Sequence, residues 1–167
     1  MKERRINEIK GIIFTALGII ILTSLIRFER LDLIFYTSHP KVPPDNLLGV
    51  FGAYLGGILV FLFGRISSFF IPFFILFLGA NYFRQQKPHL RPARLIGALL
   101  LLISVSSLTG NIAMHSESIR FYRAGLLGSV SSNFISAYFG KFGCYIIFIT
   151  LALLSFALVS EILLSSF

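Results

Sequence analysis

Long apolar runs separated by short polar stretches dominate the chain, and they predict helices. Five runs contain at most one charged residue: 11–26, 47–83, 95–109, 124–139 and 142–160. A membrane-spanning helix needs about 20 residues, so most of these runs match one helix each. The run 47–83 is too long for a single span and is interrupted at Phe63-Gly64-Arg65. The pattern therefore predicts six helical segments.

The composition decides between a soluble and a membrane protein. Apolar residues make up 56% of the 167 positions and charged residues 13%, about half the charged share of a soluble domain. A soluble globule needs more charge than this to cover its surface. The composition excludes an ordinary soluble enzyme, a disordered tail and a coiled coil, and it predicts an all-α membrane protein.

An internal repeat relates two parts of the chain by a shift of 76 residues. In each copy, small residues recur at i, i+3, i+4, i+7 and i+8, which is one face of an α-helix. Frequent glycine in membrane helices is the alternative explanation, but eight matched positions favour a repeat. We expect this face to pack against other helices, with Gly52 and Gly128 against a helix backbone. The aligned small positions are Gly49, Gly52, Ala53, Gly56 and Gly57 in the first copy and Gly125, Gly128, Ser129, Ser132 and Asn133 in the second; Phe63-Gly64-Arg65 and Phe139-Gly140-Lys141 supply the other three pairs.

Both small-faced helices end in a Phe-Gly-basic sequence. Gly64 and Gly140 suit a helix C-cap, where a left-handed conformation is needed. Arg65 and Lys141 are interpreted as snorkelling anchors at a helix C-terminus, with binding of anionic lipid as the alternative. Pro72 is expected to kink the span that follows the first copy.

The distribution of Lys and Arg predicts which segments cross the bilayer, because cytoplasmic segments are enriched in these residues. Residues 1–10 and 84–94 hold four each, so we place both on the cytoplasmic side. An even number of crossings must then separate them. Spans 11–27 and 66–83 supply two, so 47–63 is expected to lie in the outer interface or to enter and return. The basic residues behind this topology are Lys2, Arg4, Arg5, Lys10, Arg84, Lys87, Arg91 and Arg94.

The same reasoning covers the second half, and it gives four transmembrane helices plus two interfacial or re-entrant helices in two similar three-helix units. The second interfacial helix has a polar face, formed by Ser129, Ser132, Asn133 and Ser136. The predicted chain begins with a basic N-terminus at 1–10, and a cytoplasmic loop at 84–94 separates the two units. The first unit, 11–83, has a span at 11–27, an outer loop at 28–46, an interfacial helix at 47–63 and a span at 66–83. The second unit, 95–164, has a span at 95–110, an outer loop at 111–122, an interfacial helix at 123–139 and a span at 142–163.

No motif for catalysis, metal binding or cofactor binding occurs in the sequence. It contains neither a G-x-x-x-x-G-K-[ST] phosphate loop nor an H-E-x-x-H zinc motif, and His39, His89 and His115 are isolated. With Cys144 as the single cysteine, an internal disulfide and a cysteine metal cluster are both excluded. We therefore expect no catalytic, cofactor-binding or metal-binding residues, and no enzyme activity.

Several glycine-containing motifs occur in an order that resembles a known family. The family is the four-span N-terminal membrane domain of the FtsK/SpoIIIE DNA translocases of bacteria, and the resemblance covers nearly the whole chain. The matching residues are Gly49, Gly52, Ala53, Phe63, Gly64 and Pro72 in the first half and Gly125, Gly128, Phe139 and Gly140 in the second.

The resemblance implies an anchor in the bacterial inner membrane, enriched at the division septum, with both termini in the cytoplasm. In that family a linker and a hexameric ATPase motor follow the membrane domain, so we expect the motor to be absent from this chain, whether the chain is a fragment or a stand-alone protein. Implied partners are the lipid bilayer, other division proteins and further copies joined through the motor. The topology explains the net charge of +8, so no specific nucleic-acid binding is expected.

A small two-repeat transporter or channel subunit is the alternative function. Transport proteins usually carry acidic or basic residues, or broken helices, within their spans. The predicted spans have no central charge, and this favours the anchor.

The topology can be tested by cysteine labelling in intact cells. We expect a cysteine at Gln86 to be protected from a membrane-impermeant thiol reagent, and a cysteine at Ser118 to react, because the two loops are predicted on opposite sides. Cys144 is replaced in both variants, and permeabilised cells show that each cysteine can react. External labelling at Gln86 would contradict the four-span topology.

Overall fold

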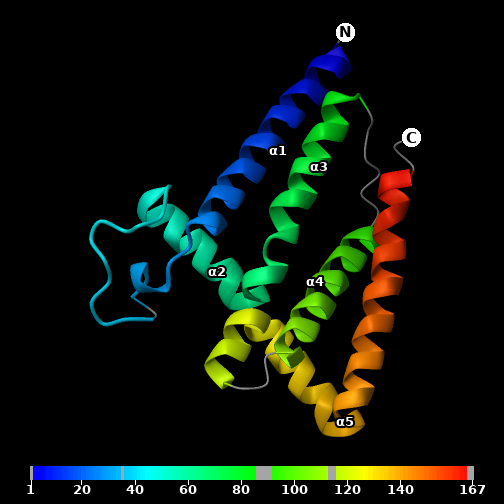
Figure 1. Cartoon of the computed structure of the whole chain (residues 1–167). Coiled ribbons are helices and arrows are strands. Elements are labelled where there is room, and N and C mark those ends of the chain that lie inside the picture. Colours follow the sequence, from blue (N-terminus) through cyan, green and yellow to red (C-terminus); the bar gives the residue numbers. More distant parts are fainter. Residues whose placement is uncertain (1, 35, 86–91, 113–115, 165–167) are drawn as a thin grey trace. The chain divides into compact units, whose positions relative to one another are not determined.

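Five α-helices and one short 3-10 helix make up the computed structural model, which describes residues 2–34, 36–85, 92–112 and 116–164 (Figure 1). No strand occurs in these ranges, so the predicted all-α class is confirmed. Two compact units divide the chain: Met1–Val60 with Ser68–Lys87, and Phe61–Ser67 with Pro88–Phe167. The elements are α1 (Lys2–Ile26), η1 (Arg30–Asp32), α2 (Gly49–Ser67), α3 (Phe70–Phe83), α4 (Pro92–Ile112) and α5 (Glu117–Leu164).

Four helical stretches are long and apolar enough to cross a membrane, and this confirms the predicted number. They are Glu3–Ile26, Gly49–Ser67, Leu95–Ile112 and Glu117–Ser160. Three of them overlap predicted spans. The fourth is α2, which we predicted in the interface, whereas the predicted span 66–83 contains α3, a helix of only 14 residues.

Length alone does not decide whether α2 or α3 crosses the bilayer. Non-helical backbone angles at Gly64 interrupt α2 and Gly49 at its start has positive φ, so its regular part runs from residue 50 to 63. At about 1.5 Å per residue, this part and α3 are each roughly 21 Å long, less than the hydrocarbon thickness of about 30 Å. The packing of each helix against its neighbours therefore matters more than its length.

In the first unit, α1 and α3 lie side by side and run in opposite directions (Figure 1). Glycines at two levels of the pair permit the close approach. A Cβ atom added at Gly18 would lie 2.7 Å from Leu76 Cγ, and one added at Gly79 would lie 2.6 Å from Thr15 Oγ1. Close packing at small residues is typical of helices in membranes.

The basic N-terminal turns of α1 lie beside the C-terminal end of α3. Asn7 Nδ2 donates a hydrogen bond to Gln85 Oε1 at 3.2 Å, and Lys10 Nζ lies 5.7 Å from the ring centroid of Tyr82. Arg84 is the C-cap residue of α3, so two of the basic clusters share one end of this unit. Among the predicted topology residues, Lys87 and Arg91 lie outside the described residues, as do the side chains of Lys2 and Arg94.

The loop before α2 closes over the C-terminal end of α1. Asn46, which is 5% exposed, donates hydrogen bonds from Nδ2 to the carbonyl oxygens of Ser24 at 2.9 Å and Arg27 at 3.2 Å. Its Oδ1 accepts a hydrogen bond from Leu48 N at 3.1 Å. The last carbonyls of a helix lack partners within the helix, so Asn46 satisfies the end of α1 and positions the start of α2.

In the second unit, α4 lies beside the last part of α5, and α5 is bent twice (Figure 1). The bends occur at Gly125 and Gly140 and divide α5 into segments 117–124, 126–139 and 141–164. Near the start of α4 and the end of α5, a Cβ atom added at Gly97 would lie 3.1 Å from Leu158 Cβ. The predicted outer loop 111–122 is shorter than expected, because α5 begins at Glu117.

The predicted kink at Pro72 is wrong. Helix α3 begins at Phe70, which places Pro72 in the first turn. Backbone N–H groups in a first turn have no acceptor within the helix, so proline is tolerated there. No residue of α3 has non-helical backbone angles. The break that the structure shows lies upstream at Gly64, where φ is 79° and ψ is 168°, within the Phe63-Gly64-Arg65 interruption predicted from the sequence.

Replacing Asn46 with Ala should lower the free energy of unfolding by about 1–3 kcal/mol, because the carbonyls of Ser24 and Arg27 lose a buried donor. Denaturant unfolding of the purified chain in detergent, followed by circular dichroism, measures the change. Ser38→Ala is the control, since Ser38 is exposed in the same loop. Equal stability of Asn46→Ala and the wild type would refute the role assigned to Asn46.

Candidate helix-crossing site and polar pocket

Four glycines in the described residues have positive φ, and they form two pairs related by the 76-residue shift of the sequence repeat. Gly49 (φ 61°) pairs with Gly125 (φ 64°), and Gly64 (φ 79°) pairs with Gly140 (φ 67°). Residues with a side chain rarely adopt positive φ, whereas glycine does so readily. Positive φ thus recurs at the 76-residue shift, and the two-repeat arrangement stays a prediction.

The conformation at Gly64 and Gly140 differs from the left-handed C-cap that we predicted. Both combine positive φ with an extended ψ, 168° at Gly64 and −179° at Gly140. A left-handed helical residue has ψ near +47°. The difference arises because a C-cap leads the chain into a loop, whereas here a second helical segment begins directly after the glycine.

Gly64 and Gly125 lie against each other's backbone, a contact that we call the glycine crossing. A Cβ atom added at Gly64 would overlap the carbonyl of Arg123, and one added at Gly125 would lie 2.7 Å from the carbonyl of Leu62. The crossing therefore needs glycine for two reasons, the positive φ and the absence of space for a side chain.

Two hydroxyl groups of α4 stabilise the glycine crossing. Ser106 Oγ, which is fully buried, lies 2.8 Å from the carbonyl oxygen of Phe63 and also within hydrogen-bonding distance of the Ala124 carbonyl. Thr109 Oγ1 lies 2.9 Å from Ser106 O and 3.2 Å from Arg123 O. Carbonyl groups beside a helix break need such donors in a membrane, where water is absent.

Two of the predicted packing glycines lie against a neighbouring helix. A Cβ atom added at Gly128 would lie 2.7 Å from the backbone carbonyl carbon of Ser106 in α4. One added at Gly56 would lie 2.7 Å from the carbonyl oxygen of Ser24 in α1. Close approach at these positions depends on the missing side chain.

The other predicted packing residues have different neighbours. Gly52, expected against a helix backbone, instead faces Asn46 and Leu48 in the loop before α2. Gly57 faces Leu33 of the same loop. The loop folds back over α2, which sequence periodicity could not reveal. Gly49 and Gly140 have no atom within 4 Å of an added Cβ, Ala53 is 1% exposed, and Ser129 Oγ is buried without a hydrogen-bond partner in the described part of the chain.

A hydrogen-bond network joins the three segments of α5 to α4. Arg120 Nη2 donates to Ser132 Oγ at 3.3 Å and to Asn133 Oδ1. Ser132 Oγ donates to Asn111 Oδ1 at 2.8 Å, and Asn111 Nδ2 contacts Cys144 Sγ at 2.9 Å. Because these polar side chains are hydrogen-bonded to one another, the network stabilises one arrangement of the bent helix.

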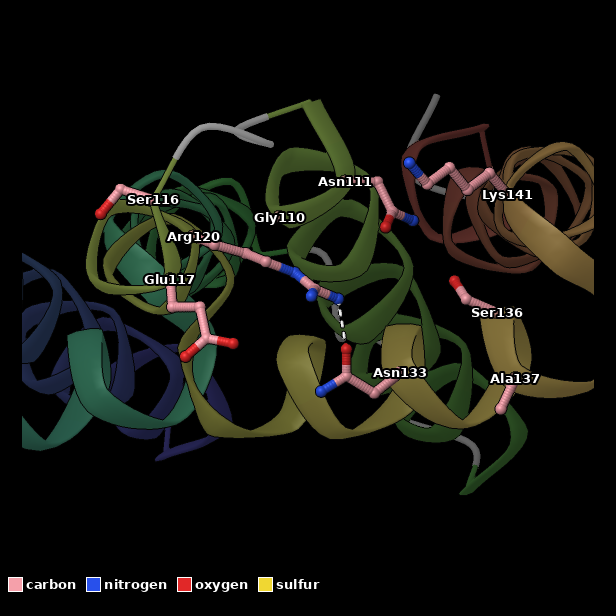
Figure 2. Close-up of a pocket in the computed structure, with 9 residues that line it drawn as sticks. All are labelled: Gly110, Asn111, Ser116, Glu117, Arg120, Asn133, Ser136, Ala137 and Lys141. Atoms are coloured by element: carbon pink, nitrogen blue, oxygen red, sulfur yellow. Dashed lines mark hydrogen bonds between the residues drawn. The ribbon is translucent and has the colours of Figure 1, made fainter.

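A pocket of about 460 Å³ lies beside this network, within the second unit (Figure 2). Among the described residues that line it, Arg120 and Lys141 are cationic and Glu117 carries a carboxylate. Figure 2 shows Arg120 reaching across the pocket to Asn133. The lining residues are Gly110, Asn111, Ser116, Glu117, Arg120, Asn133, Ser136, Ala137 and Lys141.

Asn111 and Arg120 were not among the residues predicted from the sequence, whereas Ser132 and Lys141 were. Both missed residues lie in 111–122, which we assigned to an outer loop. Polar residues are expected in a loop exposed to water, so nothing in the sequence distinguished these two. Their contacts with Ser132, 21 and 12 residues away, appear only in the folded chain.

Comparison with known families matches residues 3–167 to the 4TM region of DNA translocase FtsK/SpoIIIE. The chain belongs to this family. The resemblance predicted from the order of the glycine motifs is therefore confirmed. The description of this region as 4TM also agrees with the four long apolar helices.

Similar proteins include three bacterial relatives named DNA translocase FtsK. The one from Rickettsia prowazekii (strain Madrid E) is 31% identical over 150 residues, 89% of this chain and 19% of the relative. The one from Clostridium tetani (strain Massachusetts / E88) is 25% identical over 95% of this chain and 21% of the relative. The one from Shewanella oneidensis is 29% identical over 84% of this chain and 16% of the relative. The chain thus spans about a fifth of the length of these relatives. No solved structure matches it.

Gly64→Ala should destabilise the chain by about 1–3 kcal/mol more than Gly140→Ala. Both substitutions force an alanine into a backbone conformation that favours glycine. Only Gly64→Ala also overlaps a neighbouring backbone, whereas an added Cβ at Gly140 meets open space. Denaturant unfolding of both variants in detergent measures the difference. Equal losses would show that the crossing adds nothing beyond the backbone conformation.

Proposed function

We propose that the chain is the membrane anchor and assembly domain of a septal DNA translocase that acts in cell division and chromosome segregation. The family match over residues 3–167, together with four long apolar helices, carries the proposal. The relatives are named DNA translocases, and the chain matches 16% to 21% of their length. The part of each relative outside the matched region is where we place the motor.

The contribution of residues 1–167 is location and assembly. Phosphoryl transfer needs a loop that cradles phosphate and residues that hold Mg²⁺, and the sequence contains no phosphate-binding loop. ATP hydrolysis and DNA movement would be the work of other parts of the translocase.

We further propose that 1–10, 84–94 and the end of α5 lie in the cytoplasm, with 28–65 and 111–141 outside. Within each unit, two antiparallel helices bring the chain back to the end where it entered. In the first unit, Asn7 meets Gln85; in the second, Gly97 meets Leu158. This return supports placing the basic segments on one side, as the positive-inside rule requires.

The partners that we propose are the lipid bilayer, other division proteins and further copies held together by the motor. Large apolar side chains on the last segment of α5 are open to lipid, among them Phe142 at 87% exposure and Ile146 at 66%. An apolar exterior is what a helix bundle presents to hydrocarbon.

A fluorescent fusion of residues 1–167 in dividing bacteria tests the anchor function. We expect enrichment at the septum without any motor attached, because the membrane domain is proposed to determine location. A fusion to an unrelated four-span protein is the control and should spread over the whole membrane. Uniform distribution of the residues 1–167 fusion, together with solute flux in reconstituted vesicles, would favour the transporter instead.

A further inference from the structure

Arg120 carries a charge that its hydrogen-bond partners do not neutralise. Within the described part of the chain, the guanidinium bonds only to Ser132 Oγ and Asn133 Oδ1, both neutral groups. Both bonds use Nη2, so the donors on Nε and Nη1 stay available. Arg120 is also half-buried, which limits its hydration and strengthens its attraction for an anion.

The pocket around Arg120 has the size and the donors for a small anionic group. Its volume of about 460 Å³ falls in the range of about 300–1,000 Å³ that is usual for ligand sites. Lys141 adds a second cation, and Asn133 and Ser136 add a neutral amide and a hydroxyl (Figure 2). Glu117 offsets one positive charge, so the lining carries a net charge of about +1.

A phosphodiester fits the charge of this lining better than a phosphate dianion does. It carries one negative charge, equal and opposite to the net charge of the pocket. The Nε and Nη1 donors that remain on Arg120 can form charge-assisted hydrogen bonds to a phosphate oxygen, which are about twice as strong as neutral ones. A phosphate dianion would leave a negative charge beside Glu117.

The surroundings of the pocket favour a lipid over a soluble ligand. Segment 126–139 carries large exposed apolar side chains, among them Val130 at 59%, Phe134 at 61% and Tyr138 at 73% exposure. A helix that combines such side chains with a polar face lies at the level of the lipid headgroups. Phospholipid phosphates are concentrated at that level, whereas a soluble anion would have to come from the medium.

We propose that this pocket binds the headgroup phosphodiester of an anionic phospholipid. Arg120 holds the phosphate oxygens, and Lys141 and Ser136 line the remainder of the site. A zwitterionic phosphatidylcholine binds more weakly, because its trimethylammonium group would enter a cationic pocket. The proposal uses the predicted outer placement of 111–141 and is independent of the septal role.

Native mass spectrometry of the full chain, released from micelles that contain phosphatidylglycerol or phosphatidylcholine, tests the proposal. The wild type should retain phosphatidylglycerol in preference. Arg120→Gln should weaken that retention about tenfold, because charge-assisted hydrogen bonds to the phosphate are lost. Arg123→Gln removes an equal charge from the same segment outside the pocket and should leave retention unchanged.

Two further variants should change phosphatidylglycerol retention in opposite directions while keeping Arg120 in place. Glu117→Gln removes the opposing carboxylate and should strengthen retention severalfold. Asn133→Asp places a carboxylate beside the guanidinium and should weaken it about as much as Arg120→Gln does. If Arg120→Gln fails to fold, the opposite effects of Glu117→Gln and Asn133→Asp on phosphatidylglycerol retention test the proposal.

Four results would overturn the proposal. Equal losses in Arg120→Gln and Arg123→Gln would show attraction by overall charge alone. Binding of glycerol 3-phosphate or inorganic phosphate, without preference for phosphatidylglycerol, would identify a soluble anion. Binding of an acidic peptide in place of the lipid would identify a protein partner. A fusion that still reaches the septum without this lipid preference would leave the anchor function intact and overturn the lipid site alone.

Discussion

The contact between the backbones at Gly64 and Gly125 constrains much of the second unit. Two helix breaks meet there, and neither position has space for a Cβ atom. A break inside an apolar region exposes carbonyl groups that water cannot reach, so other parts of the chain must supply donors. Ser106 and Thr109 of α4 supply them, and this links the course of α5 to the position of α4.

Each unit uses the same physical means to reverse its direction. A long helix ends, a buried asparagine links its end to the following segment, a glycine with positive φ interrupts that segment, and a second helix returns. Asn46 lies in the loop before α2 and binds a carbonyl of α1, whereas Asn111 lies in α4 and binds Ser132 of α5. Buried amides suit this task because they donate and accept at once. The result is a chain that enters and leaves each unit at one end.

Basic residues have two different tasks in this chain. At 1–10 and 84–94 their density matters, because the positive-inside rule counts charges and not contacts. Arg120 lies in a segment with few basic residues, and its surroundings give it defined partners, a half-buried position and a pocket. A single cation of this kind can recognise a ligand, whereas a cluster of exposed cations mainly orients the protein.

The sequence by itself determined the membrane class, the number of long apolar helices and the family, because composition, run length and the order of glycine motifs are local properties of the chain. The 76-residue shift also indicated which glycines recur, and those at both ends of each copy have positive φ. Only the tertiary structure decided that Gly64 meets Gly125, that Gly52 faces a loop, and that Asn111, Arg120 and Ser132 meet beside one pocket. It also showed that Pro72 does not kink α3, because the place where α3 begins decides whether proline interrupts a helix. These contacts join residues far apart in the chain, and hydrophobic periodicity carries no information about such pairs.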